Sequence, residues 1–162
     1  MNLSRRLATG VLTAVALTCA ALTPRALPAH EAECPVCKQE VVQDTELVDN
    51  EVAIRYGRKR IEYRCVWCAV RDAKTYTGDL TILAPSELKG KPVLLARKGE
   101  RWSVQPEETV FLGQKTHPKE CHLTFRAFAR RAALEAWAKQ HGSATAQAGP
   151  LTLPQLLELV RQ

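Results

Sequence analysis

Methionine and aromatic residues are scarce in this chain: Met1 is its one methionine, and 6% of its 162 residues are aromatic. It has no Gly-x-Ser-x-Gly, no glycine-rich phosphate loop and no His-Glu-x-x-His. The sequence therefore gives no support to serine-hydrolase, nucleotide-binding or zinc-protease chemistry. No run of lysine and arginine alternates with aromatic residues, so nucleic acid is not an expected partner. We do not predict an enzyme.

The N-terminus has the pattern of an export signal. Two arginines precede an apolar run, residues 7–22, which is shorter than the ~20 residues of a membrane span. Small residues follow, with cleavage expected after Ala29. We interpret residues 1–29 as a signal peptide and expect a periplasmic or otherwise extracytoplasmic protein. An uncleaved anchor is an alternative, and so is a lipid-anchored form, because Cys19 lies in the apolar run.

Without its signal the chain is mildly basic. The whole chain has 23 basic and 17 acidic residues. Residues 1–29 contain three arginines and no acid, so 20 basic and 17 acidic residues remain, a net charge of +3. The remaining length of about 130 residues suits one compact domain. We predict this domain over residues 30–142, followed by a linker and a short C-terminal helix over residues 143–162.

Strand-like segments precede each predicted helix. The first helix is expected from Cys65 to about Tyr76, and the second, which has an alanine-rich apolar face, from Phe125 to His141. His141 is interpreted as a charge partner of that helix's C-terminus. The fold class is therefore α+β, with antiparallel strands and two main helices in two strand–strand–helix halves. Strands are expected at 39–48, 52–56, 60–64, 79–84, 92–97, 101–104 and 108–112, a flexible linker at 143–150 and a terminal helix at 153–160.

Two Cys-x-x-Cys pairs are the most specific feature of the sequence. Cys34 and Cys37 form the first, Cys65 and Cys68 the second, and 27 residues (38–64) separate them. Four converging thiolates make a tetrahedral sulfur site typical of structural Zn(II). The same soft ligands suit Cu(I), and the spacing does not choose between the two ions. Two simple disulfides are a further alternative, because an exported protein meets an oxidising compartment.

A second group of metal-ligand residues lies in a polar loop. His117, Cys121 and His122 are close in sequence, and an imidazole beside a thiol suits copper or zinc. Cys121 is also the fifth cysteine of the mature chain, so at least one thiol has no partner for an internal disulfide. We predict Cys121 and His122 as a second site or as exchangeable ligands. His30, the expected mature N-terminus, is a weaker candidate for copper.

A thiol–disulfide oxidoreductase is the main alternative of another class. The segment from Tyr63 to Cys68 passes from a strand to Cys-x-x-Cys and then to a helix, and a helix N-terminus lowers the pKa of a thiol. The wider chain lacks the alternating strand–helix order of thioredoxin-like folds. A zinc-stapled interaction module is the third interpretation.

Longer motifs carry a resemblance to a known family. The segment from Cys34-Pro-x-Cys37 to Cys65-x-x-Cys68-Ala69, with Ile54-x-Tyr56-Gly57 between them, resembles a treble-clef-type metal-binding segment. Val110-Phe-Leu-Gly113 and the alanine-rich helix resemble the second half of the NosL family. NosL proteins are exported, often lipid-anchored copper chaperones for nitrous oxide reductase. The resemblance covers most of residues 34–142.

The resemblance implies a Cu(I) chaperone that delivers copper to an envelope or secreted metalloenzyme, such as nitrous oxide reductase, or to its assembly factors. The chain departs from the family at two places. Lys38-Gln39 replaces the usual Gly-Met after the first pair, and the loop before the last long helix has Cys121-His122 where the family has a methionine. Thiolate and imidazole still suit copper, but they also admit Zn(II). Of the family's properties, the fold is therefore the one that the resemblance implies most firmly for this chain. The identity of the metal follows, and the client protein is implied least firmly.

Overall fold

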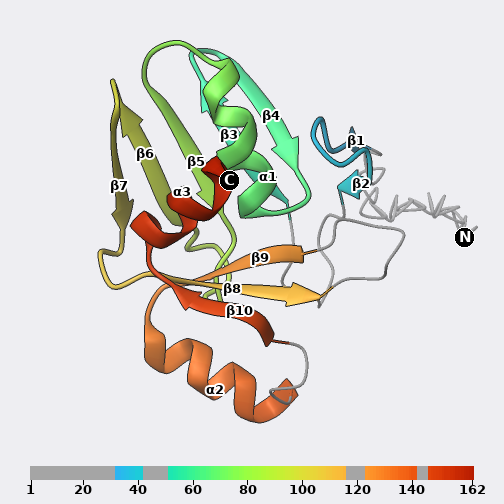
Figure 1. Cartoon of the computed structure of the whole chain (residues 1–162), viewed down its shortest axis with the longest axis vertical. Helices are drawn as coiled ribbons and strands as arrows, with labels where there is room; N and C mark the ends of the chain where they lie inside the picture. The colour runs from blue at the N-terminus through green and yellow to red at the C-terminus, as the bar shows by residue number, and fades with distance from the viewer. Residues whose placement is uncertain (1–31, 42–50, 116–122, 142–145) are drawn as a thin grey trace, which may run out of the picture.

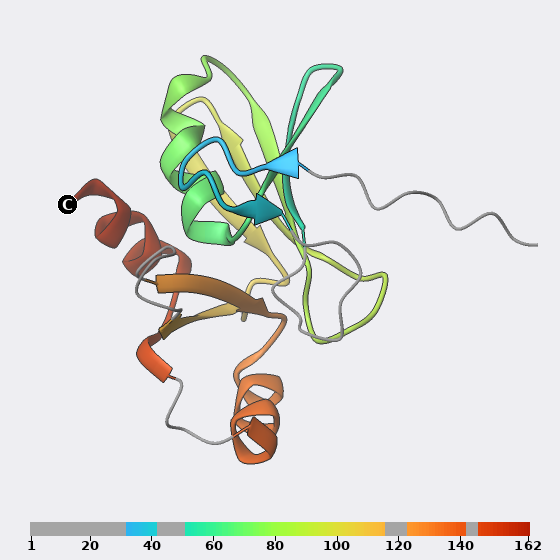
Figure 2. The ribbon, with the colours of Figure 1, turned by 90° about the vertical axis from the view of Figure 1, so that its right-hand side faces the viewer.

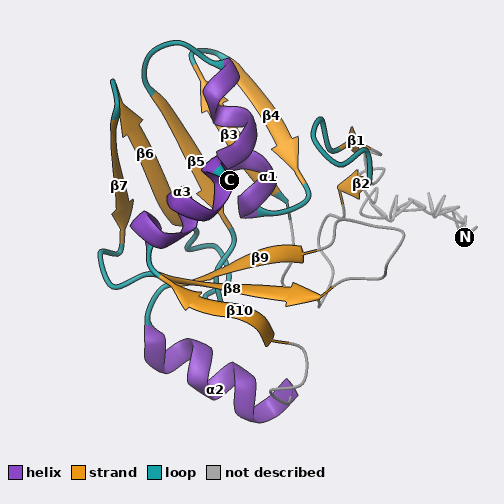
Figure 3. Ribbon diagram, viewed as in Figure 1, coloured by secondary structure: helices purple, strands orange, loops and turns teal. Residues whose placement is uncertain are grey.

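The computed structural model describes residues 32–41, 51–115, 123–141 and 146–162. These residues form ten strands, all in antiparallel sheets, and three α-helices (Figures 1 and 3). The α+β class predicted from the sequence is confirmed. The strands are β1 Ala32–Glu33, β2 Glu40–Val41, β3 Val52–Tyr56, β4 Lys59–Tyr63, β5 Leu80–Ala84, β6 Val93–Lys98, β7 Arg101–Gln105, β8 Val110–Lys115, β9 Leu123–Phe128 and β10 Ala146–Leu151. The helices are α1 Val66–Asp72, its 3-10 continuation η1 Ala73–Thr75, α2 Arg131–His141 and α3 Leu153–Arg161.

The larger sheet has five strands in the order β4-β3-β5-β6-β7. Helices α1 and α3 lie over the same face of it (Figure 1). Ile54, Ile82 and Leu95 are aligned across three neighbouring strands and are fully buried. Because side chains alternate along a strand, these three residues point to one face of the sheet. They belong to the same core cluster as the buried residues of α1 and α3, so this face, under the helices, carries the main core.

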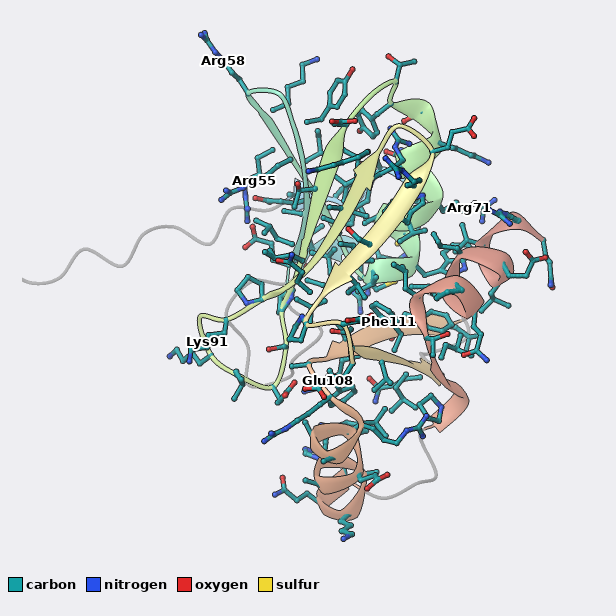
Figure 4. All side chains as sticks on the ribbon, turned by 90° about the vertical axis from the view of Figure 1, so that its left-hand side faces the viewer. Arg55, Arg58, Arg71, Lys91, Glu108 and Phe111 are labelled. Atoms are coloured by element: carbon teal, nitrogen blue, oxygen red, sulfur yellow. The ribbon has the colours of Figure 1, made fainter. Side chains whose placement is uncertain are left out.

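The smaller sheet has three strands in the order β10-β8-β9, and α2 packs against it. Phe111 of β8 is fully buried in the main core cluster, and Figure 4 shows it where the two sheets meet. By contrast, Arg55 and Arg58 of the β3–β4 hairpin project away from the molecule in the same view. On the other side of the small sheet, Phe128 and Leu134 form a separate cluster with α2. The small sheet therefore joins two apolar layers.

Strand β9 corrects the predicted start of the second helix. Residues 123–128 pair with β8, and the helix begins at Arg131 rather than near Phe125. The β9 side chains alternate between the two layers: Phe125 and Ala127 join the main core, while Arg126 and Phe128 face Trp137 of α2. The segment Leu-Thr-Phe-Arg-Ala does alternate apolar and polar residues. Phe125, Phe128 and Ala129 also have the three- and four-residue spacing of a helix face that continues into the alanine-rich helix, so the segment resembled the beginning of that helix.

Strand β10 occupies residues that the sequence suggested were a linker. Residues 146–151 pair with β8, which itself continues past Gly113 to Lys115. Gly149 has φ +119°, and a Cβ atom there would lie 2.8 Å from the carbonyl oxygen of Phe111. Because glycine has no Cβ atom, the backbone of β10 can approach β8 closely at this position. The terminal helix is confirmed as α3, which begins with a capping box between Thr152 and Gln155.

The first predicted helix and the central hairpin are confirmed. Helix α1 and η1 cover residues 66–75, and β6 and β7 pair around the turn at residues 99–100. The buried guanidinium of Arg97 donates hydrogen bonds of 2.6–2.7 Å to the carbonyl oxygens of Ala73, Tyr76 and Gly78. These bonds fasten the C-terminal end of α1 and η1 to the sheet. Among the described residues, no helix is long and apolar enough to cross a membrane.

Candidate metal centre

The first Cys-x-x-Cys pair lies in a tight turn between β1 and β2, which we call the knuckle (residues 32–41). The backbone N–H of Cys34 donates to the carbonyl of Gln39 at 2.8 Å, and that of Lys38 donates to Cys34 at 2.9 Å. Lys38 has φ 62°, a left-handed conformation that closes the turn. Cys34 is fully buried, whereas Cys37 is partly exposed. Figure 2 shows the knuckle alongside α1.

The second pair lies at the beginning of α1. Cys65 is the N-cap residue, and Cys68 lies in the first turn. The backbone N–H of Ala69 donates to the carbonyl of Cys65 at 3.2 Å. Because residues three apart share a helix face, the two thiols lie on one side, with their sulfur atoms 3.7 Å apart. Both side chains are buried, with exposed fractions of 2% for Cys65 and 0% for Cys68.

The two pairs converge. The sulfur atoms of Cys34, Cys37 and Cys68 all lie within 4.8 Å of one another. Cys65 is next to Cys68 but does not belong to this group of three. All four residues are reduced cysteines that are not joined by disulfides. The structure thus brings together the four cysteines proposed from the sequence, with three of them grouped closely enough to share one ion.

The first cysteine of each pair receives the same set of backbone hydrogen bonds. Two donors are the N–H groups two and three residues later, and the third comes from another segment. Such N–H···S bonds stabilise a thiolate before any metal is bound. The donors to Cys34 are Val36, Cys37 and Arg64, and the donors to Cys65 are Trp67, Cys68 and, from β9, Phe125.

Charge is unevenly distributed among the sulfur atoms. A hydrogen bond from Cys68, together with the backbone donors, lowers the pKa of Cys34 from 9.0 to about 5 although burial opposes the shift. The pKa of Cys65 is also lowered, first by its hydrogen bond with Cys68. The pKa of Cys68 is raised by its bonds to Cys34 and Cys65 and by burial. Without metal, Cys68 therefore keeps its proton between two thiolates, and a metal ion bound there would displace that proton.

A buried phenol network, invisible in the sequence patterns, supports α1 from the strand before it. The hydroxyl of Tyr63 donates to Asp72 Oδ2 at 2.6 Å and lies 3.1 Å from the hydroxyl of Tyr76, which is itself 3.2 Å from Asp72 Oδ2. Burial and the bond to Asp72 raise the pKa of Tyr63. Tyr63 is the last residue of β4 and lies two residues before Cys65. The network therefore fixes the end of β4, and with it the segment that leads into the second pair, against α1.

The remaining predicted ligands fall in two groups. Cys121, His122, His117 and His30 lie outside the described residues, as does Cys19. His141 ends α2, where its ring stacks on Trp137 with centroids 4.6 Å apart and Nδ1 lies 3.0 Å from the Trp137 carbonyl oxygen. His141 thus lies at the helix end, as predicted from the sequence, and its role as a charge partner stays a prediction. The backbone donors of Arg64 and Phe125 were not foreseen, because sequence spacing gives no signal for them.

Comparison with known proteins adds one structural likeness. No family model and no curated protein matches the chain. The chain resembles the crystal structure of the mercury-bound form of MerB2, with a TM-score of 0.54 and 16% sequence identity. The match covers 68% of this chain and 55% of that one, so the chain spans about half the length of its structural neighbour. At this identity the likeness concerns the fold alone.

Proposed function

We propose that this protein holds a thiophilic metal ion, with Cu(I) the favoured ion, and hands it to another protein. The observation that carries the proposal is the group of three sulfur atoms within 4.8 Å, drawn from two segments that the chain brings together. Clustered thiolates select soft ions. The structural neighbour was crystallised with mercury, also a soft ion, which supports metal binding in general. Zn(II) is the competing ion.

The order of elements supports the treble-clef-type resemblance. A cysteine knuckle, the β3–β4 hairpin and a helix with cysteines in its first turn follow one another. On the NosL-like interpretation, the protein is exported, with or without a lipid anchor, and its partner is a client metalloenzyme such as nitrous oxide reductase or an assembly factor. It would turn over no substrate. Partial exposure of Cys37 gives an acceptor thiol a place to attack the bound ion.

The sharpest test is metal binding by the reduced protein under anaerobic conditions. We expect one equivalent of Cu(I) to bind in competition with a chromogenic Cu(I) chelator, and Zn(II) to be displaced from a zinc-loaded sample. The Cu(I) affinity of Cys37→Ser should be compared with the Cu(I) affinity of a matched variant outside the site, Ser103→Ala on β7. Failure of the wild-type protein to take up Cu(I), Hg(II) or Zn(II) would reject the proposed function.

Cys121 and His122 remain the proposed delivery ligands. Their replacement by alanine in one double variant should weaken copper loading or transfer and leave the fold intact. The measurements are copper stoichiometry, the rate of transfer to a dithiol acceptor, and circular dichroism. Unchanged loading and transfer would remove these two residues from the proposal.

A thiol–disulfide function is the second candidate, favoured by the 3.7 Å separation of the Cys65 and Cys68 sulfur atoms. Oxidation of that pair needs the sulfur atoms to approach to about 2.05 Å, a short movement for residues at this spacing. Thiol counting after purification separates the candidates. A carrier retains reduced thiols and metal, whereas an oxidoreductase cycles through a disulfide, reduces insulin and holds no metal.

A further inference from the structure

The four sulfur atoms do not form a regular tetrahedron. With metal–sulfur bonds of about 2.3 Å, a tetrahedral site has six sulfur–sulfur edges of about 3.8 Å each. Cys65 has such an edge to Cys68, at 3.7 Å. It is nevertheless absent from the group whose sulfur atoms all lie within 4.8 Å of one another. The arrangement is therefore three clustered sulfur atoms with a fourth beside one of them.

The surroundings of Cys65 hold it in that outer position. Its sulfur accepts a hydrogen bond from the backbone N–H of Phe125, in the middle of β9, and Phe125 itself is 3% exposed. This donor belongs to the small sheet, whereas the backbone donor that Cys34 receives from outside the knuckle is Arg64, directly before Cys65. Movement of Cys65 toward the knuckle would break a buried bond between α1 and β9, which opposes that movement.

We infer that the ion is held by Cys34, Cys37 and Cys68 alone, and that Cys65 is a positioning residue that orients the Cys68 sulfur. The inference rests on the proposed function and names the ions that the site prefers. Three thiolates complete the coordination of Cu(I) or Hg(II), both of which accept low coordination numbers. Structural Zn(II) requires four ligands, so it would have to recruit water or another donor. The site therefore selects soft, low-coordinate ions against Zn(II).

The test is a count of sulfur ligands by X-ray absorption spectroscopy on reduced protein loaded with less than one equivalent of Cu(I). Three proteins are compared: the wild type, Cys65→Ser and Cys68→Ser. We expect three sulfur ligands in the wild type, three in Cys65→Ser and two in Cys68→Ser. Hg(II) provides a second probe, because its ultraviolet charge-transfer bands change with the number of bound thiolates.

The Cys65→Ala variant tests positioning as distinct from packing. Loss of an outer-shell partner typically weakens metal binding about 10- to 100-fold. Serine keeps an oxygen that accepts the Phe125 N–H and can form a hydrogen bond with Cys68, so Cys65→Ser should recover most of that loss. The pH dependence of proton release on Cu(I) binding should differ from that of the wild type in Cys65→Ala, and should differ much less in Cys65→Ser. Equal affinity losses with no change in proton release would indicate packing alone and overturn the positioning role.

Four sulfur ligands in the wild type overturn the inference, whichever residue supplies the fourth. A fall from three to two in Cys65→Ser overturns it as well. Should Cys65→Ser fail to fold, the wild-type count and the Cys68→Ser count still decide the question. A wild-type protein that binds no soft ion rejects the proposed function instead, which is a different result.

Discussion

The two Cys-x-x-Cys pairs have identical spacing and the same local N–H···S pattern, yet the fold supports them differently. The knuckle is held by the pairing of two strands, β1 and β2, of only two residues each. It also receives a hydrogen bond of 2.9 Å from Arg64 Nη1 to the carbonyl oxygen of Glu40. The second pair begins a helix that contacts β3, β4, β5, β9 and α3. Sequence spacing thus specifies the local geometry of a pair, whereas tertiary packing decides how firmly it is held. We expect the second pair to be preformed and the knuckle to depend on metal.

Arg97 provides the strongest test of the preformed half. Its guanidinium donates hydrogen bonds to three carbonyl oxygens, one in η1 and two in the segment after it. Arg97→Met would leave these buried acceptors without donors, at an expected cost of about 3 kcal/mol in the free energy of unfolding. Urea denaturation measures the loss. The exposed Arg101→Met on β7 is the matched control, expected within about 0.5 kcal/mol of wild type. An equally small effect at Arg97 would mean that α1 is held by apolar packing alone.

Metal removal tests the difference between the pairs directly. With the ion at 100 times its dissociation constant, binding stabilises the loaded state by about 2.7 kcal/mol. Hydrogen exchange of the knuckle amides should therefore slow by about 100-fold on Cu(I) loading. The amides of α1 should change by less than about tenfold, since packing already protects them. Equal protection of both segments would contradict the proposed asymmetry.

The phenol network gives a matched pair of variants. Tyr63 is fully buried and contacts Asp72 at 2.6 Å, whereas Tyr76 is half-buried and contacts the same oxygen at 3.2 Å. Tyr63→Phe should cost about 1–3 kcal/mol in the free energy of unfolding, and Tyr76→Phe should cost less. Thermal and urea unfolding measure both. A larger loss for Tyr76→Phe would show that Asp72 is held from the solvent side rather than by β4.

Different parts of the molecule were predictable for different physical reasons. The pair spacing predicted that Cys65 and Cys68 share a helix face, and alternation predicted the β3–β4 and β6–β7 hairpins. Strand β9 was missed because Phe125 and Phe128 also fit the spacing of the helix face that follows them, and β10 because the small and polar residues of 143–150 suggested a linker. The outer position of Cys65 depends on a backbone donor from Phe125, 60 residues away in sequence. Local patterns carry no information about such a contact.

The last prediction concerns protonation at the knuckle. Because the folded protein lowers the pKa of Cys34 from 9.0 to about 5, the stability from this thiolate is fully present above pH 9.0 and is lost as the pH falls through about 5. Cys68 acts in the opposite sense: its raised pKa favours the folded state below pH 9.0 and opposes it above.

The ultraviolet thiolate absorbance of the reduced, metal-free protein measures the Cys34 titration. It should persist at neutral pH and decrease as the pH falls through about 5, and this component should be absent in Cys34→Ser. Far-ultraviolet circular dichroism over the same range separates protonation from unfolding. Loss of the Cys34 component already near pH 9.0, the ordinary value, would mean that the N–H groups of Val36, Cys37 and Arg64 do not prepare a thiolate. The knuckle would then need the ion even to ionise its first ligand, and the difference between the two pairs would be one of charge as well as packing.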